Sequence, residues 1–146
     1  MRADEPTREL TSMWAKHALG DLAAARVLAQ SPDIDPSTVG FHAQQAIEKA
    51  LKSVLVLGQI DFSRSHDLVG LMHRLPSGWD LGLDEEQLAR VSQFAVETRY
   101  PIEDWNDVAE PRNVEVTAAV ELAARVIQVI LDRFAEKGLG IPHTPG

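Results

Sequence analysis

The chain has 146 residues, a hydrophobic content of 45% and a net charge of −8, which together indicate one folded domain with its own core. It contains no cysteine, so disulfides, thiol catalysis and cysteine-bound zinc are excluded. Its acidity argues against bulk DNA or RNA binding, because such binding requires lysine and arginine to neutralise phosphates. We find no secretory signal and no run near the roughly 18 apolar residues of a membrane span, so we expect a cytoplasmic protein.

The first two helices are long and are marked by caps and by periodic apolar residues. The first is predicted from about Thr7 to Gln30, and the second from Asp35-Pro36 to near Gly58. An aspartate cap followed by proline is a common helix start, because the first helical N–H has no partner to lose. The apolar stripe of the first helix comprises Trp14, Ala18, Leu22, Ala25 and Ala29. The apolar face of the second comprises Ala43, Ile47, Ala50, Leu51 and Val54.

A short third helix and a longer fourth helix follow. Ser65 is the predicted cap of the third helix, which ends before the Pro76–Gly78 break. The fourth is predicted to begin at Asp84 and to end around Arg99, because Pro101 disfavours helix at the residue before it. The inward side chains predicted for the fourth helix are Leu88, Val91 and Ala95, with Phe94 near the edge.

The last helix is predicted from about Val114 to Lys137, and residues 138–146 are expected to form a flexible tail. Long helices with short connections predict an all-α, up-and-down antiparallel bundle of four main helices and one short helix. We expect residues 1–146 to form one domain with its core at about 7–137. The last helix is apolar on nearly every side, so it either lies centrally or forms an interface, and we expect a homodimer.

Polar residues on the second helix are the first candidates for function. His42, Gln45, Lys49 and Lys52 are spaced three, four and three residues apart, which places them on one stripe. Gln45, Glu48, Lys49 and Lys52 are either a solvated face with local ion pairs worth about a few tenths of a kcal/mol each, or part of an anion-binding surface. In the second case Lys49 and Lys52 would bind phosphate.

The third helix and the end of the fourth add further candidates. His66, near a helix start, would either cap and pack or act as a neutral imidazole that accepts and donates protons. Arg99 would either form a salt bridge or hold phosphate, and Tyr100 would stack or hydrogen-bond. The candidate ligand-binding residues are therefore Lys49, Lys52, His66, Arg99 and Tyr100, with His66 and Arg99 as candidate catalytic residues. The histidine spacing predicts no metal site, and no cofactor is expected.

Four sequence segments together resemble the HEPN domain family over roughly Ser12 to Phe134. They are Asp21–Ala25, His42–Lys52, Ser65-His66-Asp67-Leu68 and Arg99-Tyr100-Pro101. The resemblance implies a helical bundle, usually dimeric, in a family linked to nucleotide and RNA chemistry. It also implies a possible nucleotidyltransferase partner, since many members are prokaryotic and sit beside such an enzyme in toxin–antitoxin or defence pairs.

The usual ribonuclease motif of this family is absent. RNA-cutting members carry an arginine followed four to six residues later by histidine, but residues 116–118, which follow Arg112 at that spacing, contain none. Whether the protein is an enzyme therefore stays open. The leading interpretation is a protein that binds nucleotide or RNA phosphate and pairs with a nucleotidyltransferase. The alternatives are a ribonuclease using His66 as base and Arg99 on the phosphate, or a purely structural helical module.

Overall fold

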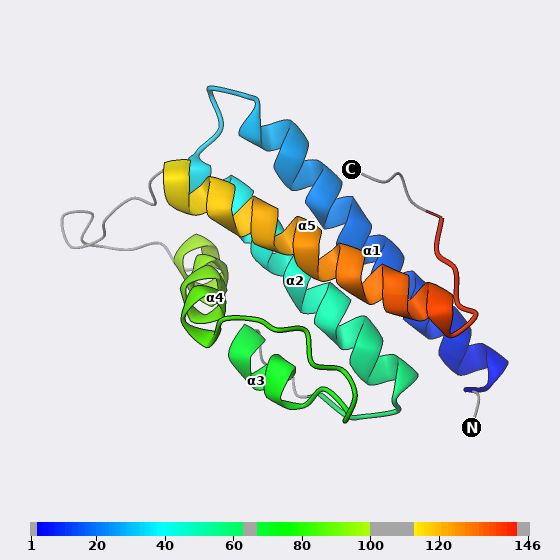
Figure 1. The fold of residues 1–146 in the computed structure, drawn as a ribbon. Coiled ribbons are helices and arrows are strands. Elements are labelled where there is room, and N and C mark those ends of the chain that lie inside the picture. Colours follow the sequence, from blue (N-terminus) through cyan, green and yellow to red (C-terminus); the bar gives the residue numbers. More distant parts are fainter. Residues whose placement is uncertain (1–2, 63–66, 100–112, 143–146) are drawn as a thin grey trace.

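A computed structural model of the chain describes residues 3–62, 67–99 and 113–142, without the side chains of residues 96–99 and 113. Within these ranges the chain forms helices and no strand (Figure 1). The helices are α1 (Glu5–Ala29), α2 (Pro36–Leu57), α3 (Leu68–His73), α4 (Glu85–Arg99) and α5 (Asn113–Glu136). The all-α antiparallel bundle of four main helices and one short helix is confirmed.

α1 begins two residues earlier than predicted because Asp4 is its cap. The Asp4 side chain accepts a hydrogen bond from the Thr7 backbone N–H at 2.9 Å. Hydrogen bonds from the Thr7 side chain and backbone hold the pKa of Asp4 below its ordinary value. Ala18, Leu22 and Ala25 are buried as predicted, whereas Trp14 is half-buried and Ala29 is exposed.

α2 is the central helix and contacts each of the other four (Figure 1). It starts at the predicted cap, where Asp35 accepts a hydrogen bond from the Ser37 N–H at 3.0 Å, and it ends at Gly58. Its whole predicted apolar face is buried. α1 and α2 pack on each other, and both bury small residues, which are Ala15, Ala18 and Ala25 on α1 and Ala43, Ala46 and Ala50 on α2.

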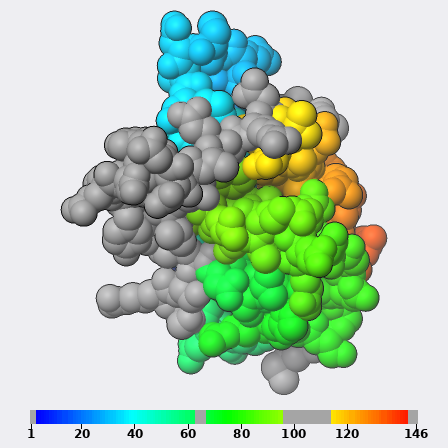
Figure 2. Space-filling view, turned by 90° about the vertical axis from the view of Figure 1, so that its left-hand side faces the viewer, coloured from blue at the N-terminus to red at the C-terminus, as the bar shows by residue number. Residues whose placement is uncertain are grey.

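α4 packs against α2 at a glycine. A Cβ added at Gly40 would lie 2.6 Å from the Phe94 ring, so only glycine leaves room for that ring. Phe94, expected near the edge, is buried at 6% exposure. Leu88, Val91 and Ala95 are buried as predicted. Figure 2 shows this side, where α3, α4 and the loop between them form a large part of the described surface.

α3 starts later than predicted and uses a different cap. Asp67, not Ser65, caps the helix, and its carboxylate accepts a hydrogen bond from the Val69 N–H at 3.2 Å. The Leu68 N–H donates to the Ser92 hydroxyl of α4 at 3.1 Å. An aspartate cap and a partner on α4 therefore set the helix start, and the second of these cannot be read from local sequence. Residues 63–66 lie outside the described part of the chain.

The segment after α5, where a flexible tail is expected, packs against the bundle as far as the structure describes it. Gly138 ends the helix with a φ of 79°. Leu139 and Ile141 are then buried at 7% and 6% exposure. Arg8 of α1 donates a hydrogen bond to the Gly138 carbonyl at 2.8 Å, which ties this segment to the start of α1. Residues 138–142 thus pack on the bundle, residues 143–146 lie outside the description, and the flexible tail stays a prediction.

α5 packs on α2 and α1 and buries most of its apolar side chains in the core. Its most exposed large apolar residues among those described are Val114 and Val129, at 78% and 38% exposure. The apolar surface that prompted the interface prediction is thus mostly internal, and the homodimer stays a prediction. None of the described helices combines the length and apolar character needed to cross a bilayer.

Candidate functional site

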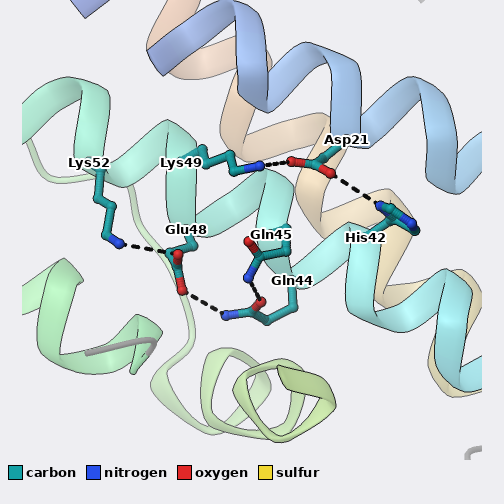
Figure 3. Close-up of polar contacts among 7 residues, drawn as sticks. All are labelled: Asp21, His42, Gln44, Gln45, Glu48, Lys49 and Lys52. Atoms are coloured by element: carbon teal, nitrogen blue, oxygen red, sulfur yellow. Dashed lines mark hydrogen bonds and ion pairs between the residues drawn. The ribbon is translucent and has the colours of Figure 1, made fainter. Parts of the chain in front are cut away.

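α2 carries two separate sets of interacting polar side chains (Figure 3). The first set, here called the seam triad, joins α1 to α2 and consists of Asp21, His42 and Lys49. The second set, here called the buried polar chain, follows α2 itself and consists of Gln45, Gln44, Glu48 and Lys52. The predicted polar stripe of α2 is therefore divided between two different environments.

The buried polar chain leads to one carboxylate. Gln45 donates to the Gln44 side-chain oxygen at 2.7 Å, and Gln44 donates to Glu48 at 3.3 Å. Lys52 donates to the other Glu48 oxygen at 3.2 Å. The Glu48 and Lys52 side chains are only 4% and 8% exposed. Charges removed from water this far must be paired and hydrogen-bonded, so the interpretation of a solvated face is wrong for these two residues.

Two aromatic rings pack against the Lys52 ammonium. Its nitrogen lies 5.6 Å from the centre of the Trp14 ring and 5.1 Å from that of Phe62. The two rings meet edge to face, with centres 5.7 Å apart. Because the two ring centres are about as far from each other as each is from the nitrogen, both rings attract the ammonium from the same side. Lys52 would therefore have to leave the Glu48 pair and the aromatic rings to reach an external phosphate.

The seam triad is centred on the carboxylate of Asp21 in α1. Lys49 Nζ lies 2.5 Å from Asp21 Oδ2, and His42 Nδ1 lies 3.1 Å from Asp21 Oδ1. The Asp21 side chain is 14% exposed, whereas those of Lys49 and His42 are 26% and 29% exposed. The carboxylate thus orients two groups that solvent can still reach. The His42 ring also packs edge to face on Phe41, with centres 5.7 Å apart.

An open groove of about 890 Å³, here called the α1 groove, runs along the outer side of α1. Asp21 and Lys49 lie at one end of it, next to the exposed side chains of Lys16 and His17. Gly20 lines the same end, and a Cβ added there would meet nothing within 4 Å. Two lysines and one aspartate line this end, whereas two glutamates and one arginine line the other end, at the first turns of α1. Only the Gly20 end suits an anion.

The predicted site residues are not gathered in one place by the described structure. Lys49 turns to Asp21 and the α1 groove, whereas Lys52 turns to Glu48 and the buried polar chain (Figure 3). His66, Tyr100 and the side chain of Arg99 lie outside the described residues. Their convergence with the lysines therefore stays a prediction. Within the described residues, no group of three side chains could hold a metal ion.

Sequence reasoning did not single out the groove residues of α1. Asp21 belongs to one of the segments that resemble the HEPN family, but its partners on α2 follow 21 and 28 residues later. Gly20 carried a weak signal of its own, because glycine inside a long helix costs about 0.5–1 kcal/mol relative to alanine. A glycine that neither breaks the helix nor makes room for a neighbour marks a position worth testing for function.

The comparisons with known proteins identify the family. The profile of the HEPN domain matches residues 11–134, a range that runs from α1 into the last turn of α5, and the chain belongs to the HEPN domain family. A relative from Methanocaldococcus jannaschii bears the name "Putative toxin MJ1304". It is 29% identical over 137 residues, which span 86% of this chain and 88% of the relative. No solved structure matched the chain.

Proposed function

We propose that this protein is the HEPN component of a toxin–antitoxin or defence pair and that it binds RNA or nucleotide phosphate. Membership of the HEPN domain family supports this proposal, as does the similarity to an archaeal protein named as a toxin across most of both chains. The proposal includes a homodimer and a nucleotidyltransferase partner, which are the arrangements that the family resemblance implies.

The charge at the Gly20 end of the α1 groove is the observation that carries the phosphate-binding part. The whole chain has a net charge of −8, so any phosphate must be bound locally. Lys16 and Lys49 line the groove there together with one aspartate, Asp21. Asp21 fixes the Lys49 ammonium in position, and the Lys49 side chain stays 26% exposed. A cation held in place at an open surface is suited to contact a phosphate oxygen.

Fluorescence anisotropy with labelled single-stranded RNA and a fluorescent ATP analogue tests this site. Lys16→Gln and Lys49→Gln should each weaken binding and lower the log–log salt slope by roughly 0.7 for RNA. The matched control is Arg90→Gln, which removes the same charge from an exposed position on α4, a helix that packs mainly on α2 and α3. Equal losses in all three variants would rule out the groove, and absence of binding by the unmodified protein would rule out the function.

The same assay tests the sequence-predicted residues outside the described structure. We expect Arg99→Ala, His66→Ala and Tyr100→Phe to weaken binding if these side chains share the ligand with Lys49. Binding that is unchanged in one of these variants removes that residue from the proposed site. The corresponding Lys52→Met variant should affect stability more than affinity, because Lys52 pairs with Glu48 and packs against Trp14 and Phe62.

Growth of a bacterial host tests the toxin role directly. Induced expression of this protein alone should arrest growth, and co-expression of the proposed nucleotidyltransferase partner should restore growth. The Lys16→Gln and Lys49→Gln variants should be less toxic than Arg90→Gln at equal protein levels. Normal growth with abundant folded protein and no partner would contradict the toxin role.

A further inference from the structure

Asp21 determines which nitrogen of the His42 ring carries the hydrogen. The His42 Nδ1 lies 3.1 Å from Asp21 Oδ1, and an ionised carboxylate only accepts hydrogen bonds. In the neutral imidazole, Nδ1 must therefore be the donor, which leaves a lone pair on Nε2. No residue in the described part of the chain hydrogen-bonds to Nε2. His42 thus presents an acceptor, and it points away from Asp21 (Figure 3).

The histidine is not needed to balance the charge of Asp21. Lys49 already pairs with the other oxygen of that carboxylate at 2.5 Å. The imidazole is nevertheless oriented twice, by Asp21 at Nδ1 and by the edge-to-face contact with Phe41. Its side chain remains 29% exposed. An oriented, accessible ring whose Nε2 has no partner among the described residues can accept a hydrogen bond from a ligand.

We propose that His42 Nε2 accepts a hydrogen bond from the 2′-hydroxyl of RNA or of a ribonucleotide, and so distinguishes ribose from deoxyribose. This inference rests on the proposed function, in which Lys49 contacts the phosphate of the same ligand. An acceptor nitrogen cannot bond to a phosphate oxygen, which is also an acceptor, but it pairs well with a hydroxyl donor. The 2′-hydroxyl is the group by which a protein tells RNA from DNA at a given site.

The spacing within the seam triad suits such a ligand. One carboxylate separates the His42 ring from the Lys49 ammonium, so both groups lie within the length of a single nucleotide. Gly20, beside Asp21, leaves the α1 groove open at this end. His42 is not itself among the residues that line the groove, so a ligand with its phosphate at Lys49 would extend past Asp21 to bring its ribose to His42.

Nitrogen-15 NMR of the histidine rings in the full-length protein tests the tautomer without any ligand. His42 should give the pattern of an imidazole protonated at Nδ1, and Asp21→Asn should weaken that preference. A ring protonated at Nε2 in the unmodified protein would overturn the proposal, because Nε2 would then be a donor. This measurement does not depend on whether the protein binds RNA.

Three probes of one sequence test the ribose contact, namely single-stranded RNA, its 2′-O-methyl form and DNA. One hydrogen bond predicts that the unmodified protein binds RNA about three- to tenfold more tightly than either of the other two. His42→Phe keeps a ring against Phe41 but removes the acceptor, and it should abolish the preference while DNA binding persists. The control is His73→Phe on α3, where the histidine forms an exposed pair with Glu85 of α4, and this variant should keep the preference for RNA.

The outcomes separate the two proposals. If the unmodified protein binds RNA, 2′-O-methyl RNA and DNA equally, or if the preference survives in His42→Phe, the ribose inference is wrong and phosphate binding stands. If none of the probes binds, both proposals are wrong. The comparison of RNA with 2′-O-methyl RNA and DNA is made on the unmodified protein. This comparison therefore tests the ribose inference even if His42→Phe does not fold.

Discussion

Replacement of Lys52 by methionine should destabilise the fold substantially, although lysine is normally a surface residue. Lys52→Met removes the ammonium from a pair whose side chains are 8% and 4% exposed. Glu48 is then left in a buried position without that cation. Methionine fills a similar volume against the Trp14 and Phe62 rings, so little of the effect should come from a cavity.

The expected cost is about 3 kcal/mol in the free energy of unfolding. Removing one partner of a buried ion pair typically costs about 3–5 kcal/mol. The lower end applies here because Glu48 keeps the hydrogen bond from the Gln44 amide at 3.3 Å. For a domain of this size, that loss lowers Tm by roughly 6–12 °C. The double variant Glu48→Gln with Lys52→Met removes both charges and should recover at least half of the loss.

Urea unfolding followed by circular dichroism gives these free energies. The control is Glu85→Gln, which breaks the exposed pair between Glu85 and His73, whose side chains are 57% and 58% exposed. That change should stay within about 0.5 kcal/mol. A Lys52→Met variant that costs no more than Glu85→Gln would refute the buried ion pair. The buried ion pair would also be refuted if the double variant lost as much free energy of unfolding as the two single variants lose together.

Further predictions concern three other positions and one pH effect. Gly20→Ala should raise the free energy of unfolding by about 0.5–1 kcal/mol, because alanine favours the helix and has open space at this position. Gly20→Trp should instead fill the α1 groove and weaken ligand binding. Gly40→Ala should lower the free energy of unfolding by about 1–3 kcal/mol through overpacking against Phe94. Leu139→Ala should lower it by about 2 kcal/mol or more, measured by urea unfolding, whereas a flexible tail would give no change. The lowered pKa of Asp4 predicts a contribution to stability that is present above its ordinary value of 3.8 and is lost as the pH falls through its folded value; Asp4→Asn should remove that part of the acid dependence in pH-dependent unfolding.

Local sequence signals predicted most of the helix boundaries. The Asp35-Pro36 start and the Gly58 end of α2 were read from residues that act on their own backbone neighbours. The start of α3 was misplaced because two capping residues compete there, and the contact with Ser92 on α4 was not visible in the local pattern. The packed segment after Gly138 was missed because two isolated apolar residues carry no periodicity.

The candidate site was harder to predict because burial and long-range pairing decide it. A Glu48–Lys52 pair four residues apart has the same spacing on an exposed helix as in a core. In the fold, the Lys52 end of the pair packs against Phe62 and Trp14, which come from other segments of the chain. Similarly, His42 was named as a polar residue, but its role follows from the position of Asp21 on another helix. Helix periodicity gives the face of a residue, whereas the partner facing it requires the fold.

Backbone amide NMR during titration with short single-stranded RNA tests most directly whether a ribonucleotide binds at the Gly20 end of the α1 groove. We expect the largest shift changes at the backbone amides of Gly20, Asp21, Lys49 and His42. Saturable changes confined to α4 or α5, with these four residues unmoved, would contradict it.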